Sequence, residues 1–125
     1  MKALSLRPEW AMPVMFGAKT VEVRSWKTDY RGKLLICSSN RPTAGTIAGH
    51  ALCVVNLVDV VPFEDIHMEE SLLDSFPDKP VYAWLLSNVE WVEPFPVKGQ
   101  LGLYDVDDST NYARLIRPYI YRSTS

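Results

Sequence analysis

The sequence predicts an α+β fold that is mainly β: a small barrel of five to six mostly antiparallel strands with one or two short helices. Short apolar runs recur along the chain, and turn residues, among them 9 Pro and 6 Gly, separate them. Strands and helices do not alternate as they would in a parallel sheet. The chain has 125 residues, 47% of them hydrophobic, which suits one globular domain.

The N-terminal third contains a short apolar run, a helix and a strand. Ala3–Leu6 is the apolar run. Pro8–Phe16 begins with a proline where a helix would start and ends before Gly17, but Pro13 inside it would remove an interior hydrogen bond, so we expect a short or kinked helix. Lys19–Trp26 then alternates as a strand does.

The rest of the chain supplies the other strands. Lys33–Ser39 and His50–Val61 are apolar and bounded by turn residues, so both are expected to be strands. Phe63–Phe76 has helix-like apolar spacing and several acids, which indicates a solvated acidic helix or two short turns. Val81–Val92 is expected to be a strand pair or one long bent strand, and Leu101–Val106 the last strand.

Composition narrows the class of protein. No run of eighteen apolar residues and no signal-peptide-like start is present, so we expect a cytoplasmic protein that does not contact membranes. Cys37 and Cys53 lack CxxC spacing and a neighbouring histidine, which favours buried reduced thiols over a disulfide or zinc site. We expect neither a metal nor another cofactor.

Charge is distributed unevenly along the chain. Residues 1–33 carry seven Lys or Arg against three acids, a charge of +4, and the remaining 92 residues therefore carry −6. Such asymmetry suits a basic cleft for an anionic or phosphate-bearing ligand. A chance excess of exposed lysines is the alternative.

The strand at Lys19–Trp26 carries unusual polar side chains. A period of two places Thr20, Glu22, Arg24 and Trp26 on one face and Lys19 on the other. Since burying unpaired charge is unfavourable, the face with the carboxylate and the guanidinium is either a satisfied ion pair or a functional site.

Several motifs in order resemble one known family. They are Ser5–Ala11, Gly17–Trp26, Tyr30–Ile36, Tyr82–Trp84, Leu86–Val89, Pro94–Gly99 and Leu101–Tyr104. Together they are similar to the ASCH domain over about residues 3–106, so we expect an ASCH domain at residues 1–106 and a tail at 107–125 docked on it through residues such as Leu115 and Tyr119. The resemblance implies a PUA-like β-barrel whose cleft gathers a Lys, a Glu and an Arg and which associates with RNA or modified nucleotides.

The resemblance also implies two possible reactions. One branch of ASCH-like proteins removes the acyl group from N4-acylated cytidine with a Lys, a Thr three residues later and a Glu farther along; other members are described as ribonucleases. Lys19 matches that Lys, but Glu22 stands where the Thr would be. If the protein is an enzyme, we expect metal-independent hydrolysis with Glu22 as general base and Lys19 or Arg24 stabilising developing negative charge.

The sequence therefore leaves three functions open. The protein is an RNA- or nucleotide-binding protein, a small hydrolase acting on RNA or a modified nucleoside, or a protein-interaction adaptor that uses the acidic residues 64–70. The residues expected to bind the ligand are Ser5, Lys19, Glu22, Arg24, Trp26, Tyr30, Arg31, Tyr82, Trp84 and Lys98. Trp10 is expected in the core, Trp84 either in the core or against a base, and His50 receives no catalytic role.

Overall fold

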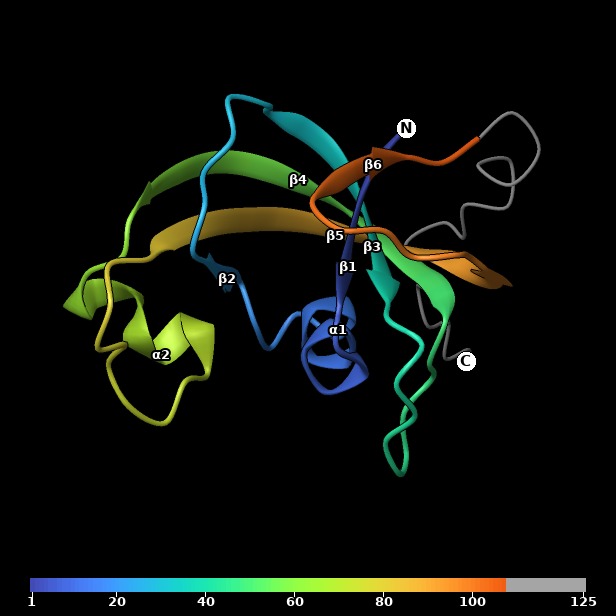
Figure 1. The fold of residues 1–125 in the computed structure, drawn as a ribbon, viewed down its shortest axis with the longest axis horizontal. Helices are drawn as coiled ribbons and strands as arrows, with labels where there is room; N and C mark the ends of the chain where they lie inside the picture. Colours follow the sequence, from blue (N-terminus) through green and yellow to red (C-terminus); the bar gives the residue numbers. More distant parts are fainter. Residues whose placement is uncertain (108–125) are drawn as a thin grey trace, which may run out of the picture.

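The computed structural model describes residues 1–107, which form one six-stranded mixed sheet curled into a half-barrel (Figure 1). The elements are β1 (Lys2–Leu6), α1 (Pro8–Met15), β2 (Val21–Arg24), β3 (Gly32–Ser38), β4 (His50–Pro62), the 3-10 turn η1 (Asp65–His67), α2 (Met68–Ser71), β5 (Tyr82–Pro96) and β6 (Leu103–Asp105). The predicted fold class is confirmed. The expected C-terminal tail lies outside the described residues.

The sheet has the order β2-β5-β4-β3-β1-β6. All neighbouring strands are antiparallel except β1 and β3, which run parallel. The 13-residue β4 and the 15-residue β5 pair along their lengths. The segment expected at Val81–Val92 to be a strand pair or one long bent strand is the latter, β5. Three register irregularities between β4 and β5 accompany this curvature, as bulges do elsewhere.

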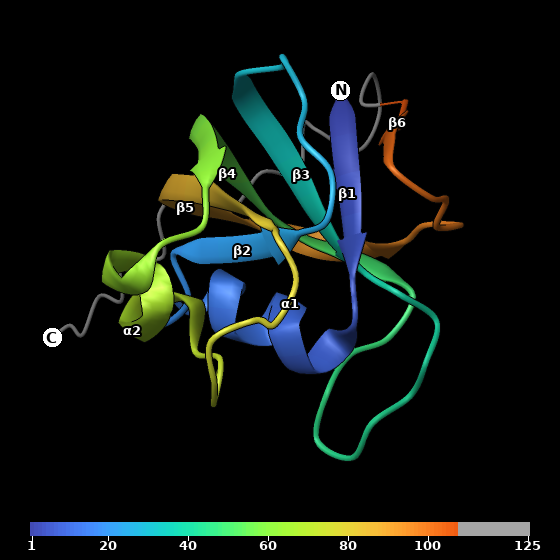
Figure 2. The ribbon, with the colours of Figure 1, turned by 60° about the vertical axis from the view of Figure 1, so that its left-hand side comes forward.

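Helix α1 covers the hollow side of the sheet (Figure 2). Pro8 occupies its first turn, where no backbone donor is needed, and the helix buries Ala11, Val14 and Met15. Pro13 lies inside it, and its carbonyl accepts hydrogen bonds from the backbone N–H groups of residues 18 and 19. The short helix predicted over Pro8–Phe16 is confirmed.

The acidic segment after β4 forms two short helical turns, η1 and α2, the second of the two forms expected from its spacing. The backbone N–H of Glu64 donates to His67 Nδ1 at 2.9 Å, and Leu72 ends α2 with a left-handed φ of 62°. This segment packs beside β2, where the N–H of Thr20 donates to the carbonyl of Glu70.

The core lies between the curled sheet and α1. Its largest fully buried side chain is Trp84, joined by Leu4, Ile36 and Leu52 among others. Both cysteines are buried free thiols, as expected. Among residues 1–107, no helix is long and apolar enough to cross a membrane, and no group of three or more His, Cys, Asp or Glu side chains could hold a metal ion.

Candidate functional site

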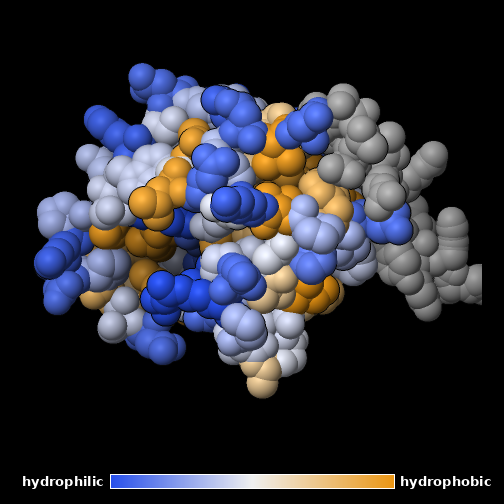
Figure 3. Space-filling view, turned by 45° about the vertical axis from the view of Figure 1, so that its right-hand side comes forward, coloured by the Kyte–Doolittle hydropathy of each residue, from blue (hydrophilic) through white to orange (hydrophobic). Residues whose placement is uncertain are grey.

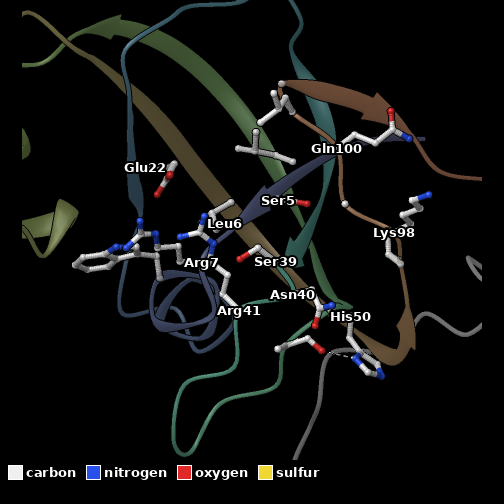
Figure 4. A pocket seen from close by; sticks show the side chains of 18 of the residues that line it. Ser5, Leu6, Arg7, Glu22, Ser39, Asn40, Arg41, His50, Lys98 and Gln100 are labelled. Carbon is white, nitrogen blue, oxygen red and sulfur yellow. Dashed lines mark hydrogen bonds between the residues drawn. The ribbon is translucent and has the colours of Figure 1, made fainter.

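A cavity of about 900 Å³ opens on the face where β1, β2 and α1 meet the loop after β3 and the segment between β5 and β6. Figure 4 shows its lining side chains, with Glu22 at one end and Lys98 and His50 at the other. In Figure 3 hydrophilic side chains border hydrophobic ones on this side of the molecule. The cavity therefore has a mixed wall, polar enough to orient a ligand and apolar enough to cover one.

The Glu22 end contains a cluster of three charged side chains. Glu22 Oε2 lies 3.0 Å from Arg24 Nε, and Glu22 Oε1 lies 3.7 Å from Lys19 Nζ. Arg24 also donates through Nη2 to the carbonyl of Ser5 at 2.8 Å. Glu22 and Arg24 line the cavity, whereas Lys19 lies behind them and is only 3% exposed.

Lys19 is held from three sides. Its Nζ donates to the carbonyl of Ser71, lies near the Glu22 carboxylate, and stands 4.8 Å from the centroid of the Trp10 ring. These contacts connect α2, β2 and α1 through one ammonium group. These contacts stabilise the charged form of Lys19 and give the residue a structural role that does not depend on a ligand.

The face assigned to Lys19 from a period of two is wrong. The strand begins only at Val21, because the N–H of Lys19 donates to Pro13 and that of Thr20 donates to Glu70 instead of to a strand neighbour. Strand alternation therefore does not apply to Lys19, and its side chain reaches the same carboxylate as Arg24.

Burial shifts both members of the Lys19–Glu22 pair toward neutrality. Desolvation raises the pKa of Glu22, while the charges of Arg24 and Lys19 oppose that rise. Desolvation likewise lowers the pKa of Lys19, and Glu22 opposes this change. The result is a carboxyl group at the cavity wall that binds a proton more readily than an exposed glutamate does.

The other end and the rim of the cavity are basic. Arg7, Arg41 and Lys98 are exposed and line it. Arg7 lies 4.0 Å from Glu9, and within residues 1–107 Arg41 and Lys98 have no carboxylate partner. With Arg24 the lining has four cations against the single carboxylate of Glu22, so it attracts anions.

Trp10 forms an apolar part of the wall. It is half-buried, packs against the core with one part of its ring and lines the cavity with another. The expectation that Trp10 belongs to the core is therefore only partly right. The indole packs against the core cluster, has the Lys19 ammonium 4.8 Å from its ring centroid, and still contributes to the cavity lining.

The other predicted aromatic residues lie elsewhere. Trp84 is fully buried, with its ring 4.8 Å from that of Trp26 in an edge-to-face contact, and its Nε1 donates to the carbonyl of Trp26. Tyr82 is the first residue of β5, two positions before Trp84, and Lys27 Nζ lies 5.9 Å from its ring centroid. None of the three lines the cavity, and Trp84 has the core position that was one of its two alternatives.

The remaining predicted residues divide between the cavity and the surface. Ser5 and Lys98 line the cavity, and the hydroxyl groups of Ser5 and Tyr104 lie 2.6 Å apart. Arg31 instead forms an ion pair with Asp59 at 2.9 Å, and the Tyr30 hydroxyl donates to the carbonyl of Lys33. The structure therefore does not bring Tyr30 and Arg31 to the cavity.

Sequence reasoning missed several lining residues: Arg7, Ser39, Asn40, Arg41, His50 and Gln100. Arg7 belongs to the Ser5–Ala11 motif of the family, which could have indicated it. Ser39, Asn40, Arg41 and Gln100 come from two segments between strands that have no periodicity, and His50 is the first residue of β4. His50 Nδ1 lies 2.8 Å from the carbonyl of Ala48, which orients the ring at the rim.

Comparisons with known proteins agree on one family. The family model of the ASCH domain matches residues 4–114. The crystal structure of ASCH from Zymomonas mobilis has a TM-score of 0.68 at 18% identity, covering 90% of this chain and 91% of that chain.

Two mutant forms of the same Zymomonas mobilis protein are similar in the same way. A Tyr-to-Phe mutant has a TM-score of 0.69 at 18% identity, covering 85% of this chain and 89% of that chain. A Ser-to-Ala mutant has a TM-score of 0.67 at 19% identity, covering 85% and 87%. No curated protein matches the sequence at a significant level.

Proposed function

The chain belongs to the ASCH domain family, and from that premise we propose that its cavity binds a nucleotide or a short single-stranded RNA segment. The observation that carries the proposal is the pair of exposed cations, Arg41 and Lys98, that line the cavity without a carboxylate partner among residues 1–107. Unpaired cations beside a concave, partly apolar surface suit a ligand that carries both phosphate and a flat base.

Each part of such a ligand has a chemical counterpart in the wall. Phosphate groups pair with Arg7, Arg41 and Lys98 at the rim. A base stacks on the accessible side of Trp10, a contact worth about 1–3 kcal/mol per base. Its edge meets the acceptor oxygens of Glu22 beside the donors of Arg24.

Arg24 holds the polar end of the wall in place. Its Nε pairs with the Glu22 carboxylate at 3.0 Å, and its Nη2 donates to the carbonyl of Ser5 at 2.8 Å, so the guanidinium has a fixed orientation at the cavity lining. A planar guanidinium held in this way suits a phosphate or carbonyl oxygen of the ligand.

The binding experiment uses fluorescence anisotropy with a labelled single-stranded RNA of mixed sequence. We expect the double variant Arg41→Ala/Lys98→Ala to bind at least tenfold more weakly than wild type. Its salt dependence should also be shallower, because each phosphate contact contributes a slope of about 0.7 in log K against log salt. The matched control is Arg31→Ala/Lys33→Ala, which removes the same charge outside the cavity. Equal losses in the two double variants would contradict a specific site.

Hydrolysis is the second candidate, and the Glu22 carboxyl favours it. Burial raises the pKa of this group beside two cations, an arrangement suited to taking a proton from water or a hydroxyl while Arg24 stabilises the developing negative charge. In this scheme Glu22 receives the proton, the oxygen attacks the substrate, and the leaving group takes the proton back.

The hydrolase test follows products by chromatography with mass detection. The substrates are a short single-stranded RNA and a panel of modified nucleosides that includes N4-acetylcytidine. Glu22→Gln, assayed at a temperature at which circular dichroism shows it folded, should retain the ligand and lose the product. Retention of ligand with no product from wild type would leave the protein as a binding module and remove the catalytic roles of Lys19, Glu22 and Arg24.

A further inference from the structure

A second feature of the molecule is a set of apolar side chains exposed on the turn-rich segment 63–78. Ile66 is 77% exposed, Phe76 49% and Leu72 38%. A hollow of about 420 Å³ opens here, lined by Ile66, Phe63 and Phe76 together with Glu64 and Asp65. We call residues 63–78 the acidic-apolar surface. Exposed apolar side chains around a hollow are typical of a surface that another molecule covers.

The acidic-apolar surface is preformed. The Phe63 and Phe76 rings meet edge to face with centroids 5.3 Å apart, and Phe63 also lies 5.6 Å from the His67 ring. The Lys19 ammonium group holds the carbonyl of Ser71 from beneath. Ordered walls reduce the entropy lost when a partner binds.

Charge indicates the kind of molecule that covers this surface. Six carboxylates lie within the segment: Glu64, Asp65, Glu69, Glu70, Asp74 and Asp78. All six are exposed, and within residues 1–107 none forms an ion pair with a Lys or Arg. Such a field repels RNA, anionic membranes and other phosphate-bearing molecules and attracts cations.

We propose that the acidic-apolar surface docks a basic segment of a partner protein, in which one or two apolar side chains enter the hollow and flanking Lys or Arg side chains pair with the carboxylates. The apolar contacts supply most of the affinity, and the charges select the partner and speed its association. The surface shares no lining residue with the cavity, so the two can be occupied independently.

The probe is a fluorescein-labelled synthetic peptide with two leucines and a phenylalanine flanked by arginines, titrated with the full chain by anisotropy. In one control peptide Glu replaces each Arg, and in the other Ser replaces each apolar residue. We expect only the basic apolar peptide to bind. Ile66→Ser, Phe76→Ser and the double variant Glu69→Lys/Glu70→Lys should each weaken binding at least tenfold. Val58→Ser is the matched control, because Val58 is also an exposed apolar residue, at 51%, but lies on β4.

Several outcomes would overturn the proposal. Equal binding of the acidic control peptide, or equal losses in Val58→Ser and Ile66→Ser, would show nonspecific association. A concentration-dependent dimer in light scattering that Ile66→Ser dissociates would assign the surface to a second copy of this chain. If the peptide binds only after Arg114, Arg117 and Arg122 are changed to Ser, the acidic-apolar surface is assigned to the chain's own C-terminal segment. RNA binding by Ile66→Ser serves as the readout for the cavity and is expected to equal that of wild type.

Discussion

Replacing Glu22 by Gln tests whether the buried charge cluster is as strongly coupled as its geometry indicates. The substitution keeps the shape of the side chain and removes the charge that faces Lys19 at 3.7 Å and Arg24 at 3.0 Å. The side chain of Arg24 is 24% exposed and regains water contacts, whereas that of Lys19 is 2% exposed and does not. The main effect therefore falls on Lys19.

The magnitude follows from what Lys19 does in the variant. Removing one member of a buried ion pair typically destabilises a protein by about 3–5 kcal/mol. Lys19 limits the loss by releasing its proton, and holding a lysine neutral at pH 7 against an unfolded pKa near 10.4 costs at most about 4–5 kcal/mol. We therefore expect Glu22→Gln to lower the free energy of unfolding by about 3–5 kcal/mol at pH 7.

The loss should shrink as the pH rises. In the variant the folded state holds Lys19 neutral and the unfolded state holds it protonated, so the unfolded state binds more protons below its pKa. Stability then increases with pH, by up to about 1.4 kcal/mol per pH unit. In the wild type burial also lowers the pKa of Lys19, but Glu22 opposes the change, so its slope is smaller.

The assay is urea unfolding followed by tryptophan fluorescence at pH 7 and pH 9. Glu90→Gln is the control, because it removes the same charge from a surface pair with Lys33, 3.7 Å apart and with side chains 35% and 58% exposed. Surface pairs of this kind contribute about 0–1 kcal/mol. Equal losses in Glu22→Gln and Glu90→Gln, or an unchanged gap between them at pH 9, would refute the reasoning.

Three further predictions concern packing and access. Trp84→Ala removes the largest fully buried side chain and should lower the free energy of unfolding by about 3–5 kcal/mol in urea titration; a loss below about 1 kcal/mol would contradict its core role. Burial raises the pKa of Cys37 to about 11 and that of Cys53 to about 12, so at pH 8 Ellman's reagent should react only as fast as the protein opens. Rapid reaction of the native protein with Ellman's reagent would contradict the burial of both thiols. A Cβ at Gly99 would lie 2.9 Å from Ser5 Oγ, so Gly99→Ala should displace the cavity wall, weakening RNA binding severalfold at a nearly unchanged unfolding midpoint.

Most of the strands could be predicted from the sequence because their signals are local. An apolar run bounded by turn residues is contained within one stretch of chain, and so the predicted strand at His50–Val61 differs by one residue from the observed β4. The family resemblance was equally accessible, since its motifs are contiguous. The pairing of these strands is not local. That β1 lies parallel to β3 and antiparallel to β6 depends on contacts between residues more than thirty positions apart.

The charge cluster contains one contact that the local sequence predicts and one that depends on the tertiary fold. Glu22 and Arg24 are two residues apart on one strand and therefore share a face, so their proximity was predictable. Lys19 precedes the strand, and its position depends on backbone hydrogen bonds to Pro13 of α1 and, at the next residue, to Glu70 of α2. Neither contact can be read from the period of the strand.

The sequence by itself determined most of the strands, the buried thiols, the family and the basic character of residues 1–33. Only the tertiary structure decided which cations meet in one cavity, because Arg41 and Lys98 come from loops outside residues 1–33, while Arg31, inside them, pairs with Asp59. It also decided that Trp84 is inaccessible and that Trp10 has an accessible side. Strand formation depends on neighbours along the chain, whereas a binding site is a sum of contacts and electrostatic fields from segments that only folding brings together.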